Sequence, residues 1–114
     1  MGNKLWQPPP ASAVESRLLD AQRPLGAPAL EPLDPKTRCL AAAALTIAAG
    51  GDEAALYGLA ARRAGASWAE INGIATLVER VAGLRGGSKA STFSSAVHAL
   101  ERQARLDGAF AANA

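Results

Sequence analysis

The stretch Asp34-Pro35-Lys36-Thr37-Arg38-Cys39-Leu40-Ala41-Ala42-Ala43-Ala44-Leu45-Thr46-Ile47-Ala48-Ala49-Gly50-Gly51 decides the fold class. Asp34 is a good N-cap residue, and Pro35 suits the first turn of a helix. The pattern predicts a helix over Lys36 to Ala49 that stops at the glycine pair. From Cys39 onward this helix is apolar nearly all round, so we expect it to be central and covered on most sides.

The rest of the composition agrees with helices. Alanine supplies 28 of the 114 residues, while aromatic residues make up only 4%. Alanine is the best helix former, whereas strands favour aromatic and β-branched residues, so an all-β fold is excluded. The length fits one domain with a modest core.

Two further helices are predicted directly after the glycine pair. The first is opened by Asp52 and ends at Ala64, with Gly65 as a left-handed cap. Ser67 caps the second, and Glu70 completes a capping box. The second helix carries one apolar face, formed by Trp68, Ile71, Ile74, Ala75, Val78, Val81 and Ala82, and ends at Gly86-Gly87.

The two ends of the chain supply one helix each. Ser12 and Glu15 have capping-box spacing, which predicts a short helix over Ala13 to Gln22. A proline-rich connector, Arg23 to Leu33, follows. The last helix is predicted from Ser88 to Leu106, on an apolar stripe of Phe93, Val97, Leu100 and Ala104, with Ala109 to Ala114 as a frayed tail. The prediction is therefore an all-α fold of five helices.

The chain divides by composition into three parts. Residues 1–32 form a proline-rich N-terminal arm with a short helix, including the extended run Pro8-Pro9-Pro10. Residues 33–106 form the helical domain, and residues 107–114 a flexible tail. The core of one chain is thin because its helices carry few large side chains. We therefore expect oligomerisation to bury further apolar area.

Several classes of function are excluded or disfavoured by simple counts. One cysteine, Cys39, excludes an internal disulfide framework, and one histidine, His98, excludes a multi-histidine metal centre within one subunit. No metal or other cofactor is expected. A net charge of +2 is too small to imply a nucleic-acid or membrane partner. The longest apolar run is too short to span a bilayer, and we expect a cytoplasmic protein.

The segment from Leu33 to Leu100 resembles the carboxymuconolactone decarboxylase family, which includes the AhpD-like alkylhydroperoxidases. The resemblance rests on three features. The first is the run before the alanine-rich helix, Leu33-Asp34-Pro35-Lys36-Thr37-Arg38. The second is similar to the family's AxxxGxxxxEI helix–turn–helix and reads Ala61-Arg62-Arg63-Ala64-Gly65-Ala66-Ser67-Trp68-Ala69-Glu70-Ile71, and the third is the glycine-bearing break Gly83 to Gly87. It implies an AhpD-like all-α fold that assembles as homotrimers or homohexamers.

The sequence departs from the redox members of that family. Those members carry Cys-x-x-Cys-x-x-x-His before the turn, and the matching positions here are Gly50, Glu53 and Tyr57. Thiol–disulfide chemistry needs an attacking and a resolving thiol, so a peroxidase is disfavoured. The decarboxylase-like members carry Glu-x-x-x-His at the last two positions, and this chain keeps the glutamate and replaces the histidine with tyrosine.

Glu53 and Tyr57 are accordingly the candidate catalytic residues. They are four apart and so lie on one face of a helix. Glu53 could accept a proton, and the Tyr57 phenol could donate one or bind an oxyanion. The alternative is that Glu53 merely favours the helix dipole and that Tyr57 is an ordinary core aromatic.

Four other residues are candidates for binding a substrate. Thr76 and Glu79, together with Trp68, could line a cavity beside the third of the central helices, although Glu79 could equally reach solvent. His98 falls away from the apolar stripe of its helix and faces solvent or a subunit contact. Apart from these four, the arginines Arg62, Arg63, Arg102 and Arg105 are expected to be exposed charges, although they could bind a carboxylate if they face a pocket.

Three functions remain open from these observations. The first is a non-redox enzyme acting by acid–base chemistry (decarboxylation, isomerisation or cyclisation) on a small carboxylated or lactone-like metabolite. The second is a non-catalytic member of the family that serves as a small-molecule-binding or assembly protein. The third is a helix-turn-helix DNA-binding protein, but its recognition helix would begin Trp68-Ala69-Glu70-Ile71-Asn72-Gly73, with only Asn72 to read bases.

Overall fold

The computed structural model describes residues 11–83 and 87–112, and these residues form five α-helices and no strand. The helices are α1 (Ala11–Gln22), α2 (Pro35–Ala48), α3 (Ala54–Arg63), α4 (Trp68–Ala82) and α5 (Gly87–Ala112). Two 3₁₀ turns, η2 (Arg23–Gly26) and η3 (Pro28–Leu30), join α1 to α2. The predicted all-α fold of five helices is thereby confirmed. The run Pro8-Pro9-Pro10 and residues 84–86 of the predicted glycine break lie outside the described residues.

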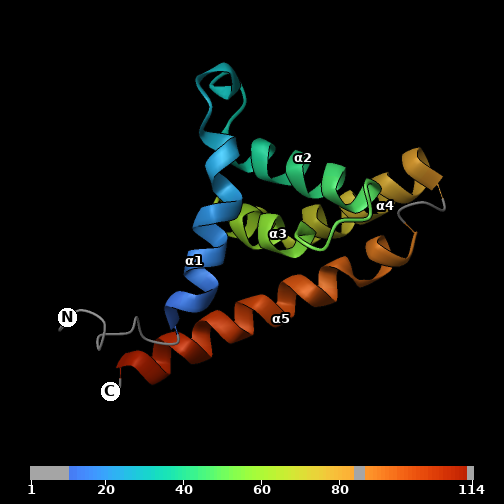
Figure 1. Ribbon diagram of the computed structural model, residues 1–114. Coiled ribbons are helices and arrows are strands. Elements are labelled where there is room, and N and C mark those ends of the chain that lie inside the picture. The colour runs from blue at the N-terminus through green and yellow to red at the C-terminus, as the bar shows by residue number, and fades with distance from the viewer. Residues whose placement is uncertain (1–10, 84–86, 113–114) are drawn as a thin grey trace.

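The long helix α5 forms one side of the molecule. It packs against α1, α3 and α4, and Figure 1 shows it running along the base of the bundle beneath them. Its predicted stripe holds, because Phe93 and Val97 are buried while Leu100 and Ala104 pack against the core. The predicted tail is wrong in part: residues 109–112 continue the helix, as their alanine content allows.

Local capping signals start two helices as predicted. Asp34 caps α2, its carboxylate accepting a hydrogen bond of 2.8 Å from the Thr37 amide. Ser67 and Glu70 form the predicted capping box of α4, since each side chain accepts from the other's backbone amide. Gly65 in the turn before α4 has a φ of +107°, which only glycine adopts without strain.

The other two capping predictions are wrong. Helix α3 begins at Ala54 with Glu53 as its N-cap residue, and Asp52 instead forms an ion pair with Lys89 of α5. Helix α1 begins at Ala11, so Ser12 lies inside it, and the Glu15 carboxylate binds Arg63 of α3. In both cases the carboxylate that the local pattern assigned to a helix cap forms an ion pair with a lysine or arginine of a helix distant in the sequence.

The core lies around α3, not around α2. In α3 the buried residues are Ala54, Leu56, Gly58, Leu59, Ala60 and Ala61. Helix α2 buries only Cys39, Ala43 and Ile47, one residue per turn, and leaves Leu45 72% exposed. The expectation of a central α2 covered on most sides is therefore wrong for the single chain, in which α3 and α4 are the main neighbours of α2.

Helix α1 belongs to the same core as the predicted helical domain. Its Val14 and Leu18 are buried and lie in one cluster with residues of all the other helices. The connector after α1 is held by Arg38, whose guanidinium donates to the backbone carbonyls of Leu33 (2.6 Å) and Leu25 (3.3 Å). Among the residues described, no helix is long and apolar enough to cross a membrane.

Candidate functional site

Glu53 and Tyr57 lie together in an open hollow between α1 and α3. The hollow has a volume of about 340 Å³ and is lined by Arg17, Asp20, Ala21, Pro24, Glu53, Leu56 and Tyr57. The two candidate catalytic side chains are one helical turn apart on α3, as their spacing predicted. Glu53 is exposed at the N-cap position, and Tyr57 is half-buried against the core.

The wall opposite this pair comes from α1, which the sequence did not connect with the site. Arg17 and Asp20 line the hollow from one flank of α1, while Val14 and Leu18 on the adjoining flank are buried. Asp20 forms an ion pair of 2.9 Å with Arg23. Among the described residues Arg17 has no ion-pair partner. The hollow therefore presents one guanidinium, two carboxylates and a phenol to a small molecule.

Thr76 and Glu79 lie elsewhere, on the exposed side of α4. The Thr76 hydroxyl donates to the Asn72 carbonyl, 3.2 Å away, as threonines in helices commonly do. Neither residue lines the hollow that holds Glu53 and Tyr57. The apolar face predicted for α4 holds at Ile71 and Val78, but Val81 in the last turn is 79% exposed.

Trp68 and His98 meet each other rather than Glu53. Their rings stack with centroids 3.5 Å apart and planes inclined by 10°. The Arg62 guanidinium lies 4.3 Å from the centroid of the Trp68 ring, within cation–π distance. His98 is exposed, as expected, but it also covers Trp68 and so joins α5 to the start of α4.

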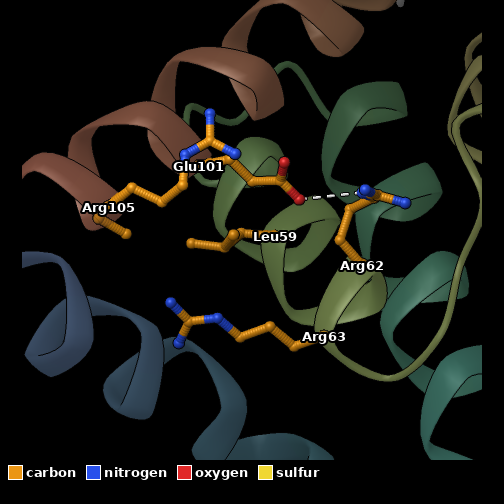
Figure 2. Close-up of a pocket in the computed structure, with 6 residues that line it drawn as sticks. Leu59, Arg62, Arg63, Glu101 and Arg105 are labelled. Carbon is orange, nitrogen blue, oxygen red and sulfur yellow. Dashed lines mark hydrogen bonds and ion pairs between the residues drawn. The ribbon is translucent and has the colours of Figure 1, made fainter. Parts of the chain in front are cut away.

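Three of the four arginines line a hollow, which was the condition for their binding a carboxylate. A second hollow, of about 380 Å³, lies between α3 and α5 and is lined by Leu59, Arg62, Arg63, Glu101, Ala104 and Arg105 (Figure 2). Arg102 is exposed and does not line it. Sequence spacing could show that Arg62 and Arg63 are neighbours, but not that a helix some 40 residues later places Arg105 beside them.

Cys39 is a buried free thiol, and the chain has no second cysteine with which it could form a disulfide. Burial raises the pKa of this thiol, with a small opposing effect of the nearby Arg38 charge. The Cys39 side chain is 6% exposed and packs in the core as a small apolar group. Among the residues that the structure describes, no three histidine, cysteine, aspartate or glutamate side chains are grouped so as to hold a metal ion.

Helices α3 and α4 follow one another with residues 64–67 between them, which is the element order that a helix–turn–helix requires. The front of α4 is acidic, however, because Glu70 closes the capping box and pairs with Lys36 of α2 at 3.0 Å. These two interactions, the capping amide first, hold the pKa of Glu70 below its usual range. A carboxylate kept ionised at this position would repel a phosphate backbone.

Comparisons with protein-family models, with curated proteins and with solved structures find no match to this chain. The resemblance to the carboxymuconolactone decarboxylase family therefore rests only on the sequence motifs of this chain.

Proposed function

We propose that the protein binds a small carboxylated or lactone-like metabolite in the hollow between α1 and α3 and acts on it by acid–base chemistry. One observation carries the proposal: Arg17, Glu53 and Tyr57, from two helices, line a single hollow. Its volume of about 340 Å³ lies at the lower end of ligand-binding cavities. The proposed compartment is the cytoplasm, on the sequence evidence given above.

Each of the three side chains has a distinct chemical role in this proposal. The guanidinium of Arg17 would hold the carboxylate of the substrate by charge-assisted hydrogen bonds. The Glu53 carboxylate would remove a proton from a carbon next to a carbonyl group. The Tyr57 hydroxyl would donate a hydrogen bond to the resulting enolate oxygen. Return of the same proton to a different carbon completes an isomerisation, and no cofactor is consumed.

The first experiment is a binding and turnover screen with small carboxylic acids and their lactones. Two-dimensional NMR would locate binding, and the change in ultraviolet absorbance of a conjugated acid would follow turnover. Glu53→Gln should abolish turnover and leave the circular dichroism spectrum unchanged, since Glu53 is exposed and makes no side-chain cap. Tyr57→Phe should lower turnover by about 10²-fold or more, the loss typical of one oxyanion donor.

The control is Glu79→Gln, which removes an exposed carboxylate from α4 outside the hollow. It should leave binding and turnover as in the parent protein. Turnover that survives in Glu53→Gln would refute the assignment of Glu53. If the parent protein binds these compounds but does not turn them over, the alternative of a non-catalytic binding protein is favoured.

Assembly into a homotrimer or homohexamer is the second part of the proposal. It is supported by apolar side chains that the described part of the chain leaves uncovered: Leu45 on α2 is 72% exposed, and Leu77 and Val81 on α4 are 51% and 79% exposed. Leu45 also borders an apolar groove of about 190 Å³ between α2 and the connector, lined by Leu25, Leu30, Leu33, Arg38, Ala41, Ala42 and Leu45. A second copy would remove this surface from water.

A further inference from the structure

The hollow between α3 and α5 is a second cavity, distinct from the one that holds Glu53 and Tyr57. The two share no lining residue. In Figure 2 the side chains of Arg62 and Arg63 extend from α3 and those of Glu101 and Arg105 from α5, with Leu59 between them. Its volume of about 380 Å³ would admit a small organic molecule.

Two of the three arginines are fixed by carboxylates. Arg62 donates from Nε to Glu101 at 2.9 Å and from Nη1 to the Ala66 carbonyl at 2.7 Å. This pair is well covered, the two side chains being 25% and 20% exposed. Arg63 donates through both terminal nitrogens to Glu15 of α1, which holds the pKa of that carboxyl below its usual range. Both guanidiniums are therefore held in place before any ligand arrives.

Arg105 is the third arginine of the hollow, and no carboxylate pairs with it among the described residues. It lines the hollow, and among the described residues it has no ion-pair or hydrogen-bond partner. Three guanidiniums thus share the region with two carboxylates, Glu101 and Glu15. The excess charge favours an anion, and the planar guanidinium is the group best matched to phosphate and carboxylate oxygens.

Part of the hollow is apolar, so a bare inorganic ion would leave it partly unfilled. Leu59 and Ala104 supply this part, one from each helix. We propose that the hollow binds a small organic oxyanion, its charged group held by Arg105 beside the fixed guanidiniums of Arg62 and Arg63, and its hydrocarbon body lying against Leu59 and Ala104. Phosphate monoesters and carboxylates share this chemistry, and the experiment separates them.

The test is a titration of the full chain at low ionic strength, followed by two-dimensional NMR and calorimetry. Three probes are used in parallel: phenyl phosphate, benzoate and inorganic phosphate. Saturable shifts confined to residues of α3 and α5 are expected with phenyl phosphate or benzoate, and whichever binds more tightly identifies the preferred charged group. Inorganic phosphate should bind more weakly because it leaves the apolar part uncovered.

Arg105→Gln is the decisive variant, because Arg105 is exposed and supports no other side chain. It should weaken binding about tenfold or more, the effect of losing one charge-assisted hydrogen bond. Arg102→Gln is the matched control, since it removes the same charge from the same helix outside the hollow. It should change the dissociation constant less than about twofold, through screened long-range attraction only.

Three results would overturn the proposal. The first is the lack of saturable binding of any probe at 10 mM (about a thousandfold above a tight metabolite site). The second is an equal loss in Arg102→Gln and Arg105→Gln, which would show diffuse attraction to a basic helix. The third is a set of shifts located at Glu53 and Tyr57. Glu53→Gln should leave this binding intact, so failure here and failure of the proposed function are distinguishable.

Discussion

Helices α2 and α3 are both rich in alanine, yet only α3 is enclosed by the fold. Helix α3 contacts α1, α2 and α5, and its inner residues Leu59, Ala60 and Ala61 are at most 1% exposed. Helix α2 contacts α3 and α4 and turns Leu45 to solvent. Apolar content alone would have placed α2 at the centre. The number of neighbouring helices, which the sequence pattern does not report, decides which of the two is buried.

Small side chains explain how α3 can accept three neighbours. Gly58 lies at the contact with α5, where an added Cβ would lie 2.9 Å from Phe93 Cζ and closer still to Val97 Cγ2. Glycine costs about 1 kcal/mol relative to alanine inside a helix. That loss is offset by the close approach of α5, which lets Phe93 and Val97 become fully covered.

The largest expected effect is therefore at Gly58. Gly58→Ala should destabilise the protein by about 2 kcal/mol or more, because overpacking outweighs the gain in helix propensity. Urea unfolding followed by circular dichroism measures the change. The matched control is Gly73→Ala on α4, where an added Cβ meets nothing within 4 Å. It should stabilise by about 0.5–1 kcal/mol. Stabilisation by Gly58→Ala as well would contradict the close contact between α3 and α5.

Local signals in the sequence predict the helices well but not their arrangement. Asp34, Ser67 and Glu70 act through hydrogen bonds to residues three positions away, so their roles are visible in a short window. Glu15 has the same spacing from Ser12, but its carboxylate binds Arg63, 48 positions later. A tertiary ion pair of this kind has no local pattern. For the same reason the burial of α1 in the core was not expected.

The candidate site divides in the same way. Glu53 and Tyr57 could be paired from sequence because residues four apart share a helix face. The place of Arg17 beside them could be found only from the structure, since Arg17 belongs to another helix. One weak signal was present: Arg17, Asp20 and Ala21 have the i, i+3, i+4 spacing of a second face beside the apolar one.

The ion pair between Glu15 and Arg63 tests how firmly α1 covers α3. It lowers the pKa of Glu15 below its usual 4.5, chiefly through the side-chain hydrogen bonds from Arg63. The stabilisation is therefore complete above about pH 4.5 and is lost as the pH falls through the lowered pKa in the folded state. Glu15→Gln should cost about 0.5 kcal/mol at pH 7, a small value because both side chains are over 40% exposed.

Urea unfolding of the parent protein and Glu15→Gln over a series of decreasing pH values from pH 7 measures this difference. The two proteins should differ at pH 7 and converge as the pH falls through the lowered pKa of Glu15, because the glutamate is then protonated in the folded and unfolded states alike. Glu79→Gln provides the control, since Glu79 is exposed and has no ion-pair partner among the described residues. A difference that stays constant over the whole acid range would show that the charge of Glu15 does not stabilise the contact between α1 and α3.

The smallest effect on the folding of one chain is expected at Leu45, which makes the exposed side of α2 the best place to test assembly. A side chain that is 72% exposed gains little from folding, so Leu45→Lys should change the stability of an isolated chain by less than about 0.5 kcal/mol. If a second copy covers this side, the lysine places a charge in an apolar contact, and the oligomer should dissociate.

Light scattering behind a sizing column should then give the mass of three or six chains for the parent protein and of one chain for Leu45→Lys. Arg102→Gln, an exposed change on α5, is the control and should keep the parent mass. A parent protein that is already a monomer at micromolar concentration would leave α2 as an exposed helix and contradict the proposed assembly.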